Sequence, residues 1–348
     1  MTARGQEQRG GVVLIVLVVL ALGSWWALEL AHSVRVEQAG SAWLRDRAGA
    51  TALAEAGIAT GRAAFERAAP ERLHLSRFAA QQAQGGAAVP GYTTGALHVT
   101  IQDETGKFPL NALARLRAQE VREASGLAGV FVRLVRLAAQ EAGRPLSPAQ
   151  ARRILGRMRD WMDADDAACM AGGGGGQAEH FGTAPGGSRA PNRPLRTLGE
   201  ALMMPVGPGL TVGDVLPPAE ARRLLTVEDT GGRININTAP REVVMALVTA
   251  PERGEAFWRA VETGRRNARR SRVPGWHLHP GGPGGASFAA VVVRCVDVRA
   301  RVAVVDAEAR CGRVTRRMRM AVRRVGGGPS QVVWSQVWTG QREGTNAA

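Results

Sequence analysis

The densest group of side chains that could do chemistry is acidic. The stretch DWMDADD contains the aspartates Asp160, Asp163, Asp165 and Asp166. Carboxylates this close to one another repel, so they must be solvated, neutralised by cations or bound to a metal. Ca²⁺ takes oxygen ligands from carboxylates, carbonyls and water, usually on a loop. The spacing lacks the Gly and the final Glu of an EF-hand, so a calcium site and a solvated helix end both stay open.

Other catalytic patterns are missing from the sequence. It contains no G-x-S-x-G, H-E-x-x-H or C-x-x-C motif, and Lys107 stands between Gly106 and Phe108, which excludes a P-loop. His277 and His279 alternate, but two histidines without a third ligand are typical of a loop. The sequence therefore predicts a protein without enzymatic activity. A periplasmic metal enzyme, based on the four aspartates alone, is an alternative.

The three cysteines, Cys169, Cys295 and Cys311, are too few for a disulfide framework. Cys295 and Cys311 lie in two runs that are predicted as neighbouring strands, so one bridge between them is open in an oxidising compartment. A bridge requires Cα atoms within about 7 Å. Three unpaired thiols are the alternative.

The N-terminus has a basic segment followed by an apolar run. Arg4 and Arg9 precede residues 12–28, which are uncharged and mostly Val, Leu and Ile. As a helix this run would measure roughly 26 Å, slightly less than the ~30 Å hydrocarbon core of a bilayer. A core helix should have a polar face, which is missing here, and a signal peptide cut after the Ala-Leu-Gly at 21–23 would leave apolar residues behind. The run predicts a retained membrane anchor with a cytoplasmic N-terminus.

The elements that follow alternate between helical and extended patterns. Residues 29–69 have apolar and charged residues at helical spacing, which predicts one long helix that leaves the membrane and stops near Pro70. Residues 95–104 alternate as in a strand. After a Gly- and Pro-rich linker at 280–285, four runs are predicted as strands: SFAAVVVRCVDV, ARVAVVDAEARC, RRMRMAVRRV and QVVWSQVW. This antiparallel sheet is expected to pack on the long helix.

Two sequence patterns occur twice in the middle of the chain. DETGKFPLN and DTGGRININ share an Asp, a turn Gly, alternating apolar residues and a final Asn. LSPAQARRIL and LPPAEARRLL share a Pro at a helix start, and in the first of them Ser147 and Gln150 predict a capping box. Further helices are expected to begin at Asn111 and at Asn237–Thr238. The repeats predict two small helical subdomains.

The leader resembles that of type IV prepilins and type II secretion pseudopilins. In that family a prepilin peptidase cleaves after a Gly, which Gly10 matches, so Gly11 would be the first mature residue. Most members have Glu at the fifth mature position, where this chain has Ile15, and one subclass of pseudopilins lacks that Glu. GKFPLN, MRDWMDADD, QAEHF, RPLRTLGEAL and GRININTAPREVVMAL follow in order. Together they resemble the minor pseudopilin K family of type II secretion systems (general secretion pathway protein K) over most of the chain.

This resemblance implies an α+β, pilin-like fold, in which a long N-terminal helix packs on an antiparallel sheet and a large all-helical domain is inserted. It implies a non-enzymatic tip subunit of the pseudopilus, which crosses the inner membrane once and has its body in the periplasm. The implied partners are other minor and major pseudopilins, the prepilin peptidase and the inner membrane, without nucleic acid. The expected divisions are a leader at 1–10, a transmembrane part at 11–31, a periplasmic helix with the first strands at 32–110, a helical subdomain with the acidic loop at 111–226, a second helical subdomain at 227–279, and the C-terminal strands at 286–340.

The resemblance also implies a calcium site in the acidic loop. Asp163 and Asp165 match the first acidic segment of the family's site, and Asp166 follows them. Glu179, in QAE, matches the Glu of a following GAE, whereas His180 stands where another acidic residue is expected. Ca²⁺ is therefore the expected cofactor. The Gly run inside this loop makes its closure entropically costly, and metal ligation would offset that cost.

A membrane-anchored DNA-binding or DNA-uptake protein is the alternative function. The net charge is +15, and a basic protein attracts nucleic acid or acidic membrane surfaces. ININTAPREVVMAL resembles the start of helix-hairpin-helix repeats, which need a Gly-rich hairpin whose backbone amides meet phosphate. Here VTAPERGEAF follows with a single Gly. The pseudopilin interpretation is therefore preferred.

Overall fold

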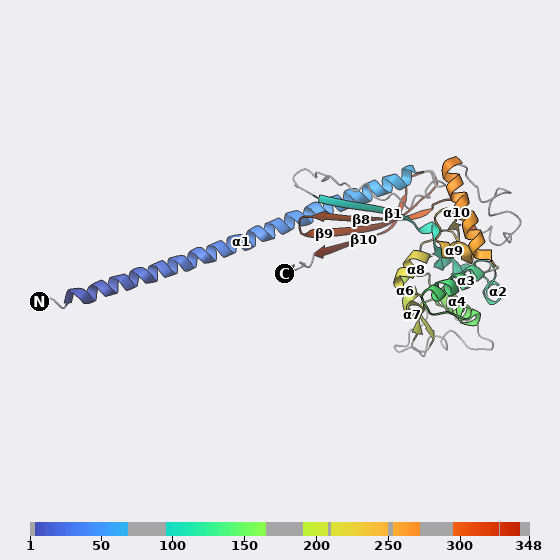
Figure 1. Cartoon of the computed structure of the whole chain (residues 1–348), viewed down its shortest axis with the longest axis horizontal. Coiled ribbons are helices and arrows are strands. Elements are labelled where there is room, and N and C mark those ends of the chain that lie inside the picture. The colour runs from blue at the N-terminus through green and yellow to red at the C-terminus, as the bar shows by residue number, and fades with distance from the viewer. Residues whose placement is uncertain are drawn as a thin grey trace.

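The computed structural model describes residues 4–68, 95–164, 191–207, 210–249, 253–271, 295–326 and 328–341. Three parts follow one another in space: a long N-terminal helix, a sheet that packs on its C-terminal half, and a helical domain at the end farthest from the N-terminus (Figure 1). The sheet therefore lies between the exposed length of the helix and the helical domain.

The long helix, α1 (Arg4–Arg67), has 64 residues and is roughly 96 Å long at 1.5 Å per residue. Its end before Pro70 confirms the prediction. Its C-terminal half buries a stripe of residues at three- and four-residue spacing, namely Ala50, Leu53, Ala54, Ile58 and Phe65. Such spacing places side chains on one face of a helix, and here that face covers the sheet.

Two glycines let α1 approach the sheet closely. A Cβ atom at Gly57 would lie 2.8 Å from Leu97 Cδ1, and one at Gly61 would overlap the side chain of Val305. Glycine costs a helix interior about 0.5–1 kcal/mol relative to alanine. The close packing that these two positions permit explains why the helix contains them.

The sheet has the strand order β1-β8-β9-β10. All three pairings are antiparallel. The strands are β1 (Gly95–Asp103), β8 (Val302–Cys311), β9 (Val314–Arg323) and β10 (Gln331–Gln341). The β8–β9 hairpin turns at Gly312, whose φ of +52° lies in the left-handed region that favours glycine. β10 forms one edge of the sheet.

The helical domain lies between β1 and β8 in the sequence. Its helices are the 3₁₀ turns η2 (Glu104–Gly106) and η3 (Leu110–Arg115), α2 (Ala118–Glu123), α3 (Gly126–Glu141), α4 (Pro148–Met162), α6 (Leu198–Met203), α7 (Val212–Val215), α8 (Pro218–Leu224), α9 (Arg241–Ala246) and α10 (Gly254–Ser271). Its short strands are β2 (Phe108–Pro109), β3 (Pro205–Gly207), β4 (Leu210–Thr211), β5 (Leu225–Thr226), β6 (Ile234–Asn235) and β7 (Val296–Asp297). One cluster of buried side chains runs from Phe108 to Val298, and α3 packs against both α4 and α9. Residues of both predicted helical subdomains therefore share one core.

The repeated patterns have matching structures. In DETGKFPLN and in DTGGRININ the apolar part forms a two-residue strand, β2 and β6 respectively. Each strand pairs in parallel with a later segment, β2 with β5 and β6 with β7. In the second pattern the predicted capping box is present. Gln150 N donates to Ser147 Oγ at 3.2 Å, and Ser147 N donates to Gln150 Oε1 at 2.8 Å. Local hydrogen bonding therefore fixes the start of α4 as the sequence predicted.

The prediction for the run SFAAVVVRCVDV is wrong in its pairing. Among the described residues this run contributes only β7, which pairs with β6 in the helical domain and not with β8. Val296 and Val298 are buried in the helical core, which explains the pairing. Cys295 packs against that core, Cys311 packs in a separate cluster beside α1, and the structure contains no disulfide between them.

The helix start expected at Asn237–Thr238 comes too early in the sequence. Helix α9 begins at Arg241, and Asn237 holds a neighbouring segment instead of capping the helix. Its Nδ2 donates to Val298 O at 3.2 Å. Asn111 behaves similarly within η3, where its side chain donates to Val227 O and accepts from Leu195 N. Both asparagines therefore join segments that are distant in the sequence.

Candidate functional site

The N-terminal half of α1 is an exposed apolar rod. Within the described ranges, α1 is the helix long and apolar enough to cross a membrane, and none of its most apolar window is buried. Ile15 is 63 % exposed, and Trp25 and Trp26 are exposed as well. Apolar surface of this extent in water is unfavourable. The same chain segment is stable when lipid or partner helices cover it.

The predicted cleavage site lies at the start of this rod. Gly10 and Gly11 are both part of α1. A Cβ atom at Gly11 would meet nothing within 4 Å, and the same holds for Gly23 further along the helix. Packing within the chain therefore does not require a glycine at position 11 or 23, in contrast to Gly57 and Gly61.

The acidic group lies at the end of α4. Asp160 and Asp163 are 1 % and 6 % exposed, so the interpretation of these two as a solvated helix end is wrong. Arg159 Nη1 lies 3.0 Å from Asp163 Oδ2, and Arg159 Nε donates to Leu116 O. The guanidinium thus supplies the cation that a buried carboxylate needs.

The remaining predicted calcium ligands, Asp165, Asp166 and Glu179, lie outside the described residues, as do Cys169 and His180. The described part of the chain contains no group of three or more metal-ligating side chains. Asp163 offers the hard carboxylate oxygens that Ca²⁺ prefers, but Arg159 already neutralises it, so the described donors alone do not make a site. The calcium site stays a prediction.

We expect calcium to raise the melting temperature of a soluble version that begins after residue 31. A ligand that binds only the folded state adds about 2.7 kcal/mol at a hundredfold excess over its dissociation constant, which corresponds to several degrees. The measurement compares melting curves in calcium, magnesium and chelator. Asp163→Ala with Asp165→Ala should abolish the calcium-dependent difference, and Glu179→Ala should reduce it.

The control for this experiment is the melting curve in chelator. Asp163→Ala also breaks the Arg159 ion pair, so its melting temperature falls in every buffer. Only the difference between calcium and chelator reports metal binding. Identical curves for the unmodified chain in both buffers would contradict the calcium prediction.

A polar network joins the sheet to the helical domain. Asp103, the last residue of β1, accepts hydrogen bonds at Oδ2 from Asn235 Nδ2 (2.7 Å) and Thr238 Oγ1 (2.6 Å), and at Oδ1 from Thr105 N (2.9 Å). The Thr105 hydroxyl accepts from the backbone N–H groups of Arg301 and Val302. Burial raises the pKa of Asp103 to about 6, against the lowering effect of its hydrogen bonds.

A second buried group lies beside this network. Lys107 Nζ is 2.6 Å from Glu104 Oε1, with both side chains nearly inaccessible. Glu228 accepts from Trp334 Nε1 of β10 at 2.6 Å, and burial raises its pKa. From the sequence, Asp103 is recognised only as part of a repeat, and Lys107 only as a residue that excludes a P-loop. The repeat D-x-x-G was the available signal for this junction.

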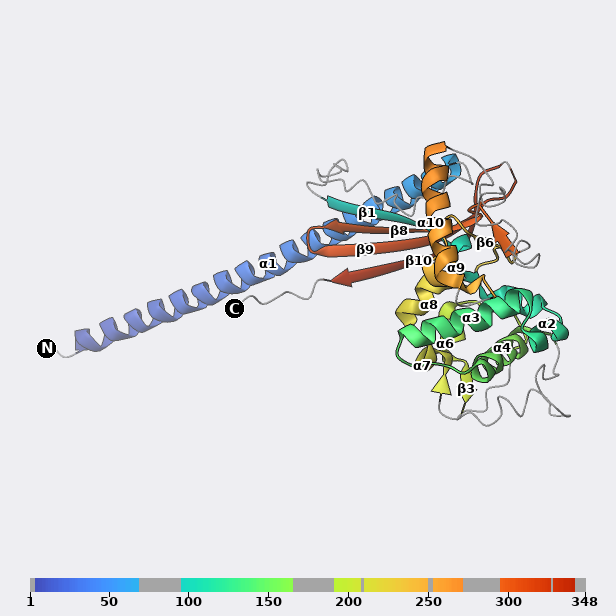
Figure 2. The same ribbon diagram turned by 45° about the vertical axis from the view of Figure 1, so that its right-hand side comes forward.

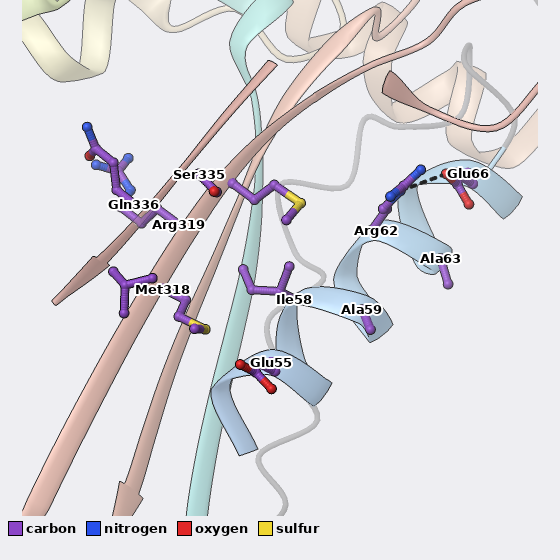
Figure 3. A pocket seen from close by; sticks show the side chains of 12 residues that line it. Glu55, Ile58, Ala59, Arg62, Ala63, Glu66, Met318, Arg319, Ser335 and Gln336 are labelled. Carbon is purple, nitrogen blue, oxygen red and sulfur yellow. Dashed lines mark hydrogen bonds and ion pairs between the residues drawn. The ribbon is translucent and has the colours of Figure 1, made fainter. Parts of the chain in front are cut away.

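A groove lies between the C-terminal half of α1 and strands β9 and β10 (Figure 3). Its volume is about 420 Å³, and its lining is mostly apolar, including Ile58, Met318 and Val337. At one end Glu66 accepts from the Ser330 hydroxyl and amide, and from Arg62 Nε. Those hydrogen bonds lower the pKa of Glu66 to about 2, and the bonds from Ser330 contribute most. They tie the segment before β10 to α1.

The possible helix-hairpin-helix motif is part of the core. Ile236, Val243, Val244 and Leu247 of ININTAPREVVMAL are completely buried. Arg265 of α10 donates to Ile236 O and Ala239 O, both at 2.7 Å. The apolar positions of the motif therefore hold the domain together.

Comparison with solved structures finds a similar chain in "The Crystal Structure of the GspK-GspI-GspJ complex from enterotoxigenic Escherichia coli Type 2 Secretion System". The TM-score is 0.54 at 18 % sequence identity, and the match covers 88 % of this chain and 99 % of that one. No family model and no curated protein sequence matches the chain. The pilin-like α+β fold predicted from the sequence is confirmed: this chain has the fold of a subunit of that secretion complex.

Proposed function

We propose that this chain is a non-enzymatic minor pseudopilin of the K type, which supports protein export by a type II secretion system. The observation that carries the proposal is the division of α1. From Gly11 on, its N-terminal half is mostly apolar and exposed, whereas its C-terminal half packs on a sheet. A helix divided in this way belongs partly to a membrane or helix bundle and partly to a folded domain. The likeness to a chain of the GspK-GspI-GspJ complex supports this choice.

The helical domain supports a position at the tip of the pseudopilus. It lies at the end of the molecule opposite the anchor in both views (Figures 1 and 2). A domain of this size beyond the sheet would block the next subunit from stacking there. Ile15 fits the same position, because this chain offers no carboxylate to the N-terminal amine of a subunit ahead of it.

The proposed partners follow from the anchor and the likeness. The exposed half of α1 would pack in the inner membrane or against the helices of other minor and major pseudopilins. A prepilin peptidase would act between Gly10 and Gly11. With the N-terminus in the cytoplasm, the sheet and the helical domain would lie in the periplasm.

The experiment that tests this function is purification of the full chain from the membranes of cells that contain it. The mature N-terminus, read by mass spectrometry, should begin at Gly11, and other pseudopilins should copurify. A mature chain that begins after Gly23, without copurifying pseudopilins, would contradict the proposal.

Replacing Ile15 with glutamate tests the tip position. Because the side chain of Ile15 is exposed, this substitution should not affect the fold of the chain. A carboxylate at this position must lose water when the rod packs in a bilayer or a helix bundle, unless a cation pairs with it. We expect reduced assembly and secretion, measured as the copurified pseudopilins and the exported protein. Ile15→Leu is the control. If Ile15→Glu assembled as well as the unmodified chain, the residue at position 15 would not support a position at the tip.

A further inference from the structure

Strand β10 is an unusual edge strand. Its sequence, QVVWSQVWTGQ, has no charge and no proline. Within the described ranges it pairs with β9 alone. Val337 and Trp338 are 46 % and 44 % exposed. Proteins usually protect such edges with charges, proline or a covering element, because unpaired backbone groups bind other strands.

The irregular part of β10 lies at its beginning. The register with β9 shifts between Val332 and Trp334, which is a β-bulge of the kind that interrupts edge pairing. From Trp334 onward the register is regular up to Gln341. The regular part is therefore the part able to accept another strand.

The groove runs along this regular part. Ser335 and Val337 of β10 line it from one side, and Ile58 and Ala59 of α1 line it from the other (Figure 3). Side chains alternate between the two faces of a strand. A strand added to β10 would therefore place every second side chain beside the apolar groove.

Apart from Glu55, the charged side chains that line the groove are paired with one another or with Asp306. Arg62 pairs with Glu66, and Arg317 and Arg319 both pair with Asp306. Recognition at this edge therefore depends on backbone hydrogen bonds and apolar contact, which is the mode of strand addition.

We propose that the regular edge of β10 pairs with an extended segment of a companion subunit, whose alternate side chains are apolar and fill the groove between α1 and β10. The identity of the companion as another pseudopilin rests on the proposed function. The edge and the groove do not depend on it.

A second copy of this chain fits the edge poorly. Two copies of β10 that pair antiparallel are related by a twofold axis, which reverses the direction of everything attached to them. Helix α1 runs alongside the strands in both views (Figures 1 and 2). The two anchors would then point in opposite directions and would not enter the same membrane.

Photo-cross-linking of the full chain, in cells with the complete secretion apparatus, tests the proposal. We would place p-benzoylphenylalanine separately at Ser335 and at Val337, and map the adducts by mass spectrometry. Both positions should capture one segment of a companion protein, at residues two apart, since a strand repeats every two residues. Adducts three or four residues apart would indicate a helix in the groove. That result would overturn the proposal, as would adducts within the chain's own C-terminus or with a second copy.

Two substitutions at one position provide the quantitative test. Val337→Lys places a charge beside the groove and should lower the Ser335 adduct by roughly tenfold or more. Val337→Thr keeps a β-branched residue and should leave it nearly unchanged. If pseudopilins copurify with the unmodified chain but Val337→Lys leaves both adduct and copurification unchanged, the edge proposal fails and the proposed function stands. If pseudopilins do not copurify at all, the proposed function fails, and the spacing of the adducts still decides the edge proposal.

Discussion

Replacing Gly10 with phenylalanine is expected to leave the chain as an uncleaved, unassembled precursor. The prepilin peptidase of the proposed family requires a Gly before the cut, and a side chain at that position would block the site. An uncleaved chain keeps the charged leader that includes Arg4 and Arg9 on the end of its apolar rod. Charges there cannot enter a bundle of apolar helices without a large desolvation cost. Secretion should therefore fall to the level of a strain that lacks the chain.

The matched control is Gly23→Phe. Gly23 lies in the same helix, and a Cβ atom there meets nothing within 4 Å, so this substitution is compatible with the fold. It is also the residue after which a signal peptidase would cut. Mass spectrometry of the N-terminus should find Gly23→Phe processed after Gly10 and Gly10→Phe unprocessed. If Gly10→Phe were processed and Gly23→Phe were not, the apolar run would be an ordinary signal peptide. The interpretation of this run as a retained membrane anchor would then be wrong.

Local patterns predicted the parts of the fold in which neighbours in sequence are neighbours in space. The long helix follows from composition and the absence of proline up to Pro70, and the capping box follows from Ser147 and Gln150. The alternation in the last three C-terminal runs predicted β8, β9 and β10. In each case the hydrogen bonds or the buried face are determined within one segment.

Long-range packing decided the parts that the sequence did not predict. The run that contains β7 has the same apolar alternation as its neighbours, but Val296 and Val298 are buried among the helices. Periodicity shows that one face is buried and does not show against which partner. The same limit applies to Asp163, whose neutralising Arg159 lies one helical turn earlier. The sequence shows that Arg159 and Asp163 are one helical turn apart. It does not show that Asp163 is buried and therefore needs the ion pair.

The repeat shows this limit most directly. Asp103 and Asp229 occupy equivalent positions in the two patterns, yet their environments differ. Asp103 is buried and accepts hydrogen bonds from the second repeat. The Asp229 side chain is 48 % exposed, and it accepts from Gly231 N within its own turn. The sequence predicts both turns and cannot tell which aspartate faces the other repeat.

This difference predicts a large loss of stability for Asp103→Ala. It removes the acceptor for Asn235 Nδ2 and for Thr105 N, both of them buried. A buried donor without an acceptor costs about 1–3 kcal/mol. Thr238 can turn its hydroxyl toward Asn235 O, which is 3.4 Å away, so its loss is smaller. We expect a loss of roughly 3 kcal/mol in the free energy of unfolding near pH 4, and a smaller loss above pH 6, where the charged carboxylate is less favourable in the folded chain.

The pH dependence of stability provides a second signature of Asp103. Its pKa is about 6 in the folded chain, against an ordinary value of 3.8 for an aspartate. Between these values the folded state binds the proton more tightly, so the unfolding free energy falls as pH rises from about 4 to about 6. The expected change over this range is about 3 kcal/mol. Asp103→Ala should remove this contribution to the slope.

Asp229→Ala is the matched control, because it deletes the same side chain from the equivalent turn. An exposed aspartate of this kind contributes within about 0.5 kcal/mol, and its removal should leave the slope between pH 4 and 6 intact. The measurement is thermal unfolding of the full chain in detergent across this pH range, for the unmodified chain and both variants. Hydrogen exchange locates the effect: in Asp103→Ala the amides of Thr105, Val302 and Ala239 should lose protection together, because one carboxylate joins the sheet to the helical domain. Equal stability losses in the two variants would show that the aspartates stabilise only their own turns. The proposed role of Asp103 in joining the sheet to the helical domain would then be wrong.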